Sequence, residues 1–533
     1  MATSTLIPDL IRLQAERCPC RKALTHRQES LSYAELWQLV TNFASALAMV
    51  GIARGDRIAV FLEKRIETVV SLFGAAAAGG VFVPVNPLLR PRQVGYILRD
   101  CNVRTLVTSR DRLLDLEPLL LECPDLVSVI LVDGGVSRLR TAAKTVVSWA
   151  EIVNGGGFAL GSRHHVIDVD MAAILYTSGS TGNPKGVVLS HRNMVSGAHS
   201  VSQYLQNDEN DSILAVLPLS FDAGLSQLTT AFSVGAQVAL LNYLSPNDVL
   251  RFCAKERITG ITGVPPLWIQ LAQQVWPSTA AENLRYFANT GGHMPRSVLD
   301  KLRTAFPNAR PFLMYGLTEA FRSTYLDPSE IDRRPDSIGK AIPNAEILVV
   351  RSDGTPCAPG EEGELVHRGA LVSLGYWNDK ERTAERFRPA PTKHAGLCVP
   401  EMAVWSGDIV RTDAEGYIYF VGRRDEMIKS SGYRISPTEI EDVLYATGMV
   451  SEAVALGVPH PTLGQGIIVI VAVAQGMELD IDGLTRECRR QLPSYMVPGV
   501  IIQRPSLPRN PNGKIDRNLL AHQLSSTFQE REA

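Results

Sequence analysis

The chain of 533 residues has almost no excess of either charge, because 53 basic and 55 acidic residues leave a formal net charge of −2. This balance gives no electrostatic basis for binding nucleic acid or an anionic membrane surface. Cysteines number only eight, and the one close pair, Cys18 and Cys20, has no histidine nearby. A zinc site is therefore not expected, and the scattered thiols fit a reducing cytoplasm.

Long apolar runs and a targeting leader are also missing. The most apolar stretch, residues 69–85, contains Ser71 and Pro84 and is short for a membrane span. We expect it to form a buried helix followed by a strand. The first residues lack a basic start followed by an apolar core, so we expect no signal peptide and a cytoplasmic protein. A chain of this length favours two or more domains.

Strand and helix patterns alternate through most of the chain, as in sheets covered by helices. Residues 33–49 are amphipathic at helical spacing, and the same strand–helix alternation returns over 213–262. Residues 345–425 are instead rich in strands and turns, with a proline-rich surface insertion at 388–401. The pattern restarts after the turn near Asp425. We therefore predict an α/β protein in which residues 1–424 form a large N-terminal domain and residues 425–533 a small C-terminal domain.

The most informative segment is residues 177–186, which follow the apolar run 171–176. It contains three glycines, four hydroxyl side chains and Lys185. Glycines let a backbone approach a ligand and turn its N–H groups inward, and the lysine adds positive charge, so the loop suits a polyphosphate. Its spacing differs from the Walker pattern, because Pro184 stands where the second glycine would be required. The usual P-loop fold is therefore not implied.

Four further segments follow in order along the chain. They are Tyr315-Gly-Leu-Thr-Glu319, Ser406-Gly-Asp408, the stretch 422–441 beginning Gly-Arg-Arg-Asp, and Asn512-Gly-Lys514. Together with the loop at 177–186 they resemble the adenylate-forming (AMP-binding) superfamily of acyl-CoA synthetases, amino-acid adenylation domains and beetle luciferases. The resemblance covers about residues 8–521. The insertion before Ser406 and the residues around 423–437 look most like bacterial acyl-CoA ligases associated with exosortase systems.

This resemblance implies an α/β fold with a large N-terminal domain, whose β-sheets are sandwiched by helices and joined by a β-rich subdomain, and a small mobile α+β C-terminal domain. It also implies a ligase that converts a carboxylic acid and ATP to acyl-AMP and pyrophosphate and then forms a thioester. The implied cofactors are ATP, Mg²⁺ and CoA, or the phosphopantetheine of a carrier protein. Phosphoryl transfer needs chiefly positioning and neutralisation of charge, which suits these residue types.

By the same resemblance, the loop holds the β- and γ-phosphates through Thr177, Ser178, Gly179, Ser180, Thr181, Gly182 and Lys185. Thr318 would bind the α-phosphate, and Glu319 would hold Mg²⁺, which prefers carboxylate oxygen. Tyr315 would stack on adenine, with Gly291 and Gly292 forming a backbone wall beside it. Asp408 would accept hydrogen bonds from both ribose hydroxyls with help from Arg423.

The C-terminal residues are implied to serve both half-reactions. Lys514 would offset negative charge on the substrate carboxylate and α-phosphate in the first. Asp425 occupies the hinge position about which the C-terminal domain would rotate. After rotation, Gly432 would line the pantetheine tunnel and Lys429 would assist thioester formation.

The acid pocket departs from the common acyl-CoA synthetase pattern. In the segment 218–224, Phe221 replaces the usual histidine, and Phe221-Asp222 resembles the amino-acid adenylation domains. We expect Phe221, Asp222 and Gly292 to line the pocket. Asp222 is either a receptor for a substrate ammonium or a supporting acid, and we favour the second role.

Three functions remain open from the sequence. The first is a carboxylate–CoA ligase. The second is a ligase that loads an amino acid or another carboxylate onto a separate acyl carrier protein. The third, disfavoured because all the implied catalytic positions are filled, is a nucleotide-binding protein without catalysis. No nucleic-acid partner and no membrane span are expected.

Overall fold

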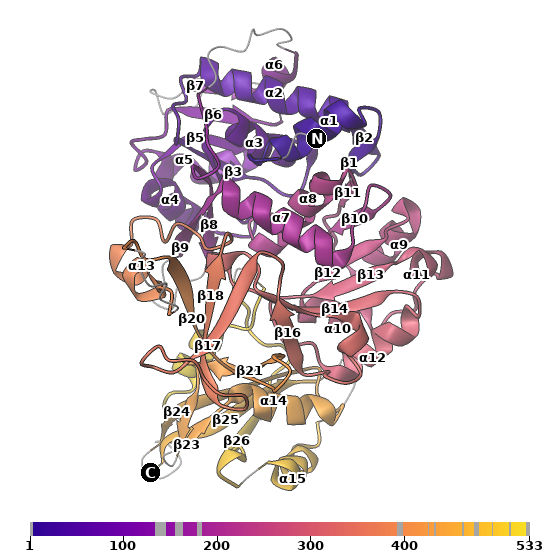
Figure 1. Cartoon of the computed structure of the whole chain (residues 1–533), viewed down its shortest axis with the longest axis vertical. Coiled ribbons are helices and arrows are strands. Elements are labelled where there is room, and N and C mark those ends of the chain that lie inside the picture. The colour runs from indigo at the N-terminus through magenta and orange to yellow at the C-terminus, as the bar shows by residue number, and fades with distance from the viewer. Residues whose placement is uncertain are drawn as a thin grey trace.

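The structure is a computed structural model. It describes residues 4–133, 145–154, 164–177, 184–391, 398–424, 426–430, 433–460, 463–473, 479–492, 494–510 and 513–528. Strands of this part of the chain form three sheets: the first lies at the upper left of Figure 1, the second extends from the upper right to the middle, and the third lies at the bottom. Among these residues, no helix combines the length and the apolar character that crossing a membrane requires.

The first sheet is mostly parallel and buried on both faces. Its order is β7 (Thr145–Ser148), β6 (Ser128–Leu131), β5 (Val103–Thr108), β3 (Arg57–Phe61), β4 (Val81–Pro84), β8 (Met171–Thr177) and β9 (Lys185–Ser190). Of these strands, only β9 runs antiparallel, to β8. Alternate residues of β3 enter different cores, since Ile58 and Val60 pack on one side and Ala59 and Phe61 on the other. Such two-sided burial is typical of parallel strands with helical crossovers.

Helices cover both faces of this sheet. They are α2 (Tyr33–Met49), α3 (Ile66–Ala77), α4 (Pro91–Asp100), α5 (Arg110–Leu120) and α6 (Trp149–Asn154). The predicted helix over 33–49 coincides with α2, which begins at a capping box in which Ser32 and Glu35 each accept a backbone N–H of the other. Helices α2 and α3 pack into the central core, whereas α4 and α5 pack into a separate core on the opposite face.

The second sheet has a parallel half and an antiparallel half. In order, the parallel half with its edge hairpin contains β14 (Arg310–Tyr315), β13 (Tyr286–Asn289), β12 (Gly260–Gly263), β10 (Ser212–Ala215), β11 (Gln237–Leu240), β1 (Lys22–His26) and β2 (Glu29–Ser32). The antiparallel half contains β17 (Ala345–Val350), β18 (Glu362–Gly369), β19 (Phe387–Pro389), β20 (Met402–Thr412), β21 (Ile418–Arg423), β16 (Ser337–Ala341) and β15 (Thr324–Leu326). The antiparallel half matches the strand-rich region predicted for 345–425.

Most helices of this part divide between two cores. The helices are α1 (Asp9–Arg17), α7 (His191–Leu205), α8 (Asp222–Val234), α9 (Pro246–Glu256), α10 (Pro265–Leu271), α11 (Ser278–Asn283), α12 (Arg296–Ala305) and α13 (Lys380–Arg386), with short 3₁₀ turns η1 (Thr318–Ala320) and η2 (Pro328–Glu330). Helices α7 and α8 share the central core with α2 and α3, so this core joins the first two sheets. Helices α9, α10 and α12 build the core on the other face of the parallel strands.

The third sheet belongs to the C-terminal part, drawn in yellow at the bottom of Figure 1. It contains β23 (Tyr433–Ile435), β22 (Ile428–Ser430), β25 (Gly464–Ala472), β24 (Glu452–His460) and β26 (Val500–Gln503). Its helices are α14 (Pro437–Ala446), α15 (Ile481–Gln491) and α16 (Arg517–Gln523), with a 3₁₀ turn η3 (Ser494–Met496). Separate apolar clusters cover its two faces. The predicted α/β class with a large N-terminal and a small α+β C-terminal part is confirmed.

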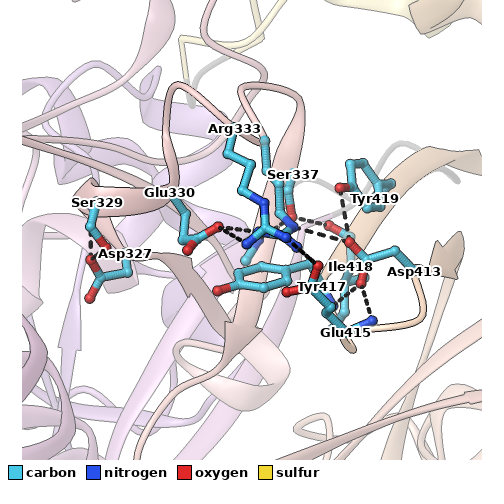
Figure 2. Close-up of polar contacts among 12 residues, drawn as sticks. Asp327, Ser329, Glu330, Arg333, Ser337, Asp413, Glu415, Tyr417, Ile418 and Tyr419 are labelled. Carbon is cyan, nitrogen blue, oxygen red and sulfur yellow. Dashed lines mark hydrogen bonds and ion pairs between the residues drawn. The ribbon is translucent and has the colours of Figure 1, made fainter.

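Arg334 joins the loop around η2 to the turn between β20 and β21. Its buried guanidinium forms ion pairs with Glu330, Asp413 and Glu415 and lies 4.0 Å above the centre of the Tyr417 ring. Figure 2 shows these carboxylates and Tyr417 gathered in one cluster. We call this group the Arg334 cluster. It fixes the start of β21, the strand that ends at Arg423.

Candidate active site

The candidate site lies at the carboxyl edge of the parallel strands β10, β12, β13 and β14. These four strands are adjacent and parallel, so the loops that follow them gather at one edge. Those loops carry Asp222, Val264, Gly291 and the segment 316–322. Ligands of open α/β sheets bind at this edge of the strands.

The structure describes only the two ends of the segment that is predicted to bind phosphate. Thr177 ends β8 and Lys185 begins β9, whereas Ser178, Gly179, Ser180, Thr181 and Gly182 lie outside the described residues. The Lys185 Nζ atom lies 4.8 Å from the centre of the Tyr376 ring. The Tyr376 hydroxyl donates a hydrogen bond of 2.5 Å to Glu319 Oε1. Lys185 and Glu319, which are far apart in sequence, therefore share one neighbour.

Positive charge dominates around Lys185. Burial lowers the pKa of Lys185, Glu319 opposes that shift, and Arg386, Arg382 and Arg423 reinforce it. Burial and the nearby Glu319 raise the pKa of Tyr376 well above its usual range, so its hydroxyl keeps its proton. A partly buried group of four cations beside Glu319 suits an anionic ligand such as a polyphosphate.

Glu319 fits the implied Mg²⁺ by its donor chemistry. Its carboxylate belongs to η1, directly after Thr318, and its backbone carbonyl accepts a hydrogen bond from Ser373 N at 2.9 Å. No cluster of three or more acidic, histidine or cysteine ligands is found among the described residues. Mg²⁺ commonly binds one or two carboxylates together with substrate phosphates, which agrees with a single glutamate here.

The three residues assigned to adenine and ribose meet across β14, β20 and β21. The Tyr315 hydroxyl donates a short hydrogen bond to Asp408 Oδ2, and Arg423 Nε lies 3.3 Å from Asp408 Oδ1. Burial raises the pKa of Asp408, and Arg423 and Tyr315 oppose this shift. The structure therefore brings Tyr315, Asp408 and Arg423 together, with the Tyr315 hydroxyl bound to the carboxylate that was assigned to ribose.

Glu364 fixes the backbone next to Asp408. Its Oε1 accepts a hydrogen bond from Gly407 N at 2.9 Å, and its Oε2 pairs with Arg424 at 2.5 Å. The Arg424 backbone N–H also donates to the Gly407 carbonyl. Consecutive arginines of one chain segment thus pair with two carboxylates, Arg423 with Asp408 and Arg424 with Glu364.

Lys514 reaches this edge from the C-terminal part. A Cβ atom added to Gly291 would lie 3.9 Å from Lys514 Cε and 3.3 Å from Val264 Cγ1. Gly291 has a φ of +76°, and Asn289 Nδ2 donates to the Gly292 carbonyl at 2.8 Å, so the loop is held tightly. Beside it, His293 Nε2 lies 3.4 Å from Asp442 Oδ1 on α14. The predicted Lys514, Gly291 and Gly292 are therefore neighbours.

The residues predicted for the second half-reaction are largely not described. Asp425 and Gly432 lie outside the described residues, and Lys429 contributes its backbone to β22 while its side chain is not described. Their roles stay predictions, as does the division of the chain at Asp425.

The predicted pocket residue Asp222 is engaged by an arginine. Arg322 Nη1 donates a hydrogen bond of 2.9 Å to Asp222 Oδ2, and the exposed fractions of the two side chains are 2% and 17%. Asp222 begins α8 directly after Phe221, whose backbone is extended. The same Arg322 Nη1 also donates to the Phe321 carbonyl at 2.9 Å.

A strained turn places Arg322 there. Phe321 has φ +57° and ψ −50°, and Arg322 N donates to the Ala320 carbonyl across it. These features define a γ-turn with positive φ at its central residue, a form that is rare and strained. The buried Phe321 ring fits against Gly197 of α7, where an added Cβ would lie 2.5 Å from Phe321 Cδ1. The turn directs residue 319 and residue 322 into different parts of the site.

Four residues of this site were missed by the sequence analysis, among them Glu364. Tyr376 and Arg386 follow no spacing that links them to the motifs, and Arg322 follows the 315–319 motif with no signal of burial. Arg386 lies over Gly407, where a Cβ would collide with its guanidinium. A buried arginine can be recognised only once its carboxylate partner is placed.

Comparison with known proteins agrees with this geometry. Residues 11–377 match the AMP-binding enzyme family, and residues 439–514 match the AMP-binding enzyme C-terminal domain. The chain belongs to the AMP-binding enzyme family. The predicted family is therefore confirmed, while the finer resemblance to exosortase-associated ligases stays a prediction.

The names of the relatives specify different acceptors, a carrier protein in one case and CoA in another. The chain is 31% identical over 517 residues to the L-proline–[L-prolyl-carrier protein] ligase of Pseudomonas fluorescens, with 95% of this chain and 97% of the relative covered. It is 29% identical to the long-chain-fatty-acid–CoA ligase of Salmonella typhimurium, with 96% and 93% covered. It is 28% identical to a linear gramicidin synthase of Brevibacillus parabrevis, but it spans only 9% of that protein.

Solved structures share the fold over nearly the whole chain. ATP-bound MatB from Rhodopseudomonas palustris superposes with a TM-score of 0.84 at 25% identity, covering 98% of this chain and 99% of the other. O-succinylbenzoate coenzyme A synthetase from Bacillus subtilis, in complex with ATP and magnesium ion, gives a TM-score of 0.79 at 25% identity, with 96% and 98% covered.

Proposed function

We propose that this chain is an AMP-forming acid–thiol ligase that activates a carboxylic acid with ATP and transfers the acyl group to CoA. The observation that carries the proposal is the position of Lys514. This lysine of the C-terminal part lies beside Gly291, at the strand edge that also holds Glu319, Asp222 and the Tyr315–Asp408 pair. An acid, a nucleotide and a mobile cation can meet at this edge.

The proposed chemistry has two balanced steps. A carboxylate oxygen of the acid attacks the α-phosphorus of ATP, the bond to the bridging oxygen breaks, and acyl-AMP and pyrophosphate form. The thiol then attacks the acyl carbon, AMP leaves, and the thiol proton is released. The first step brings anionic groups together, so cations that lie at the reacting oxygens lower its barrier.

We assign the residues of the candidate site the following roles in the first step. Lys185 and the loop that precedes it would bind the β- and γ-phosphates, and Thr318 the α-phosphate. Glu319, oriented by Tyr376, would hold Mg²⁺, which supplies charge neutralisation on the phosphate oxygens when bound. Asp408, aligned by Arg423 and Glu364, would accept the ribose hydroxyls. Lys514 would pair with the acid carboxylate and the α-phosphate.

The pocket favours an acid without an ammonium group. Asp222 already pairs with the buried guanidinium of Arg322 at 2.9 Å. A substrate ammonium at the same carboxylate would lie close to this guanidinium, and two like charges repel strongly when water is excluded. This supports the supporting-acid role of Asp222 and a plain or oxygenated acid as substrate.

The alternative acceptor is the phosphopantetheine of a separate carrier protein. The 31% identity with a carrier-protein ligase over almost the full length favours this candidate. Both acceptors are thiols of the same chemical type, so only the acceptor changes and the adenylation site stays the same. Residues Asp425, Lys429 and Gly432 would serve as hinge, thioester-step lysine and tunnel wall for either thiol.

Incorporation of labelled pyrophosphate into ATP tests the first step. The purified protein, Mg²⁺, ATP and each acid of a panel are combined without a thiol, and we expect acid-dependent exchange that EDTA abolishes. Adding CoA or a phosphopantetheinylated carrier protein then identifies the acceptor from the thioester formed. Absence of exchange with every acid would refute the ligase, and thioester formed only on the carrier would reassign the acceptor.

A further inference from the structure

Arg322 has hydrogen-bonding capacity that its surroundings leave unused. Its guanidinium has five N–H groups, and it donates to Asp222 and to the Phe321 carbonyl through Nη1. Among the residues that the structure describes, the buried Nε has no hydrogen-bond partner. An unsatisfied buried donor is costly, so a ligand acceptor at this point would be bound favourably.

A small cavity adjoins Arg322. It measures about 10 Å³, which is room for about one water molecule. Besides Arg322, its polar lining consists of the side chains of Ser226, Gln227, Thr230, Thr262 and Tyr286. These are hydroxyls and one amide, and none of them is charged. The other lining residues are apolar: Val201, Leu205, Ile213, Ala223 and Met314. The cavity therefore has room for a single small group and offers it no charged partner besides Arg322.

The charges of Asp222 and Arg322 beside this cavity already balance. Asp222 and Arg322 compensate each other, and both follow strands of the edge that carries Gly291 and Lys514. An added ammonium would meet the guanidinium, and an added carboxylate would meet Asp222. A third charge of either sign is therefore penalised, whereas a neutral oxygen can accept from Arg322 without disturbing the pair.

We propose that Arg322, held by Asp222, is the floor of the acid pocket and selects short acids that carry an uncharged hydrogen-bond acceptor, a hydroxyl or oxo oxygen, at the end remote from the reacting carboxylate. This inference rests on the proposed function. Arg322 touches the distal end of the acyl group and determines specificity without taking part in bond making. Long hydrocarbon acids are excluded because the chain would end against a buried ion pair, where the adjoining cavity has room for only about one water-sized group.

The test compares acids of equal length that differ only at the distal end. Each set of four to seven carbons contains an unsubstituted, methyl-ended acid and its oxo, hydroxyl, amino and carboxylate counterparts, such as pentanoate, 4-oxopentanoate and 4-aminopentanoate. We expect kcat/KM for pyrophosphate exchange to favour the oxo or hydroxyl acid by about tenfold to hundredfold over the methyl-ended acid, as for a hydrogen bond to a charged donor.

Two variants probe the residue, and a third serves as a matched control. Arg322→Lys keeps the charge beside Asp222 but removes the guanidinium fork, and Arg322→Met removes the charge as well. In both, the preference should fall to near unity or pass to the methyl-ended acid, mainly through KM. The control is Arg251→Met, an arginine on α9 whose side chain is 76% exposed, which should leave the preference unchanged.

A binding measurement separates this inference from the proposed activity. Thermal shift of the wild type and of Arg322→Lys with the same acids requires no turnover. If oxo and hydroxyl acids stabilise only the wild type while no acid supports exchange, the pocket assignment stands and the ligase proposal fails. If exchange proceeds but the methyl-ended acid is equal or better, or both variants keep the wild-type preference, the inference about Arg322 is overturned.

Discussion

Asp222 and Arg322 form an ion pair from which water is largely excluded, and this dictates how each can be changed. Removing one partner of a buried pair leaves an uncompensated charge, whereas replacing both with neutral groups can be almost without cost. The pair also shows where sequence reasoning ends. Asp222 could be predicted from its place after Phe221, but its partner is set by the turn at Phe321, which no local pattern reveals.

A double-mutant cycle tests the pair by urea unfolding. Asp222→Asn should lower the free energy of unfolding by about 3–5 kcal/mol, because Arg322 is left buried without a counter-charge. The double variant Asp222→Asn, Arg322→Met should recover most of that loss. If the losses caused by Asp222→Asn alone and by Arg322→Met alone simply add in the double variant, the two residues are not energetically coupled. The supporting role of Asp222 is then wrong.

The Arg334 cluster acts on a whole element, the hairpin of β20 and β21. One strand carries Asp408 and the other Arg423, which is its direct partner in the ladder. The cluster holds the far end of this hairpin through the turn at 413–417 (Figure 2). A displacement of the turn would therefore be transmitted along the strands to the pair assigned to ribose.

Neutralising the centre of this cluster should affect both stability and nucleotide binding. Arg334→Met leaves Glu330, Asp413 and Glu415 without their buried counter-charge, so we expect a lower urea midpoint and a raised KM for ATP with the acid KM little changed. Arg333→Ala is the neighbouring control: this side chain also pairs with Glu415, but it is 61% exposed, where an ion pair contributes little. Equal effects of the two variants, or an unchanged KM for ATP in Arg334→Met, would contradict a positioning role.

At the scale of the whole molecule, the C-terminal part docks with Lys514 beside Gly291 and with α14 near His293. This arrangement presents the lysine that is proposed for adenylation. The residues proposed for the thioester step belong to the segment 425–432 of the same C-terminal part, and we propose that this docked position serves adenylation alone.

Lys514→Ala separates the two half-reactions. We expect pyrophosphate exchange to fall by about 100-fold or more, as when a group that stabilises transition-state charge is removed. Thioester formation from supplied acyl-AMP and CoA should stay near the wild-type rate, and Lys301→Ala, an exposed lysine of α12, should change neither. Equal loss of both steps in Lys514→Ala would refute a role confined to adenylation.

The sequence allowed the architecture to be predicted, and it supplied most residues of the candidate nucleotide site, for a physical reason. Phosphate, ribose and metal contacts need particular residue types at turns, such as Glu319 after a strand or Asp408 beside a glycine, and these leave short motifs. Helix α2 was likewise visible through its period. Tyr376, Arg386 and Arg322 were not, because their roles arise from the approach of segments that are distant in sequence, and a lone arginine or tyrosine has no local signature.

The γ-turn at Phe321 links the preference for the acid to the position of the carboxylate proposed for Mg²⁺. These two properties are often separable. Only two residues lie between Glu319, which we propose for Mg²⁺, and Arg322, which we propose for the acid. The Phe321 ring that holds this turn packs on Gly197 of α7. A change of acid preference made within this segment would therefore also shift the carboxylate proposed for Mg²⁺. Selectivity and turnover cannot be tuned independently here, and redesign of the pocket is better started from α8 or the loop after β12.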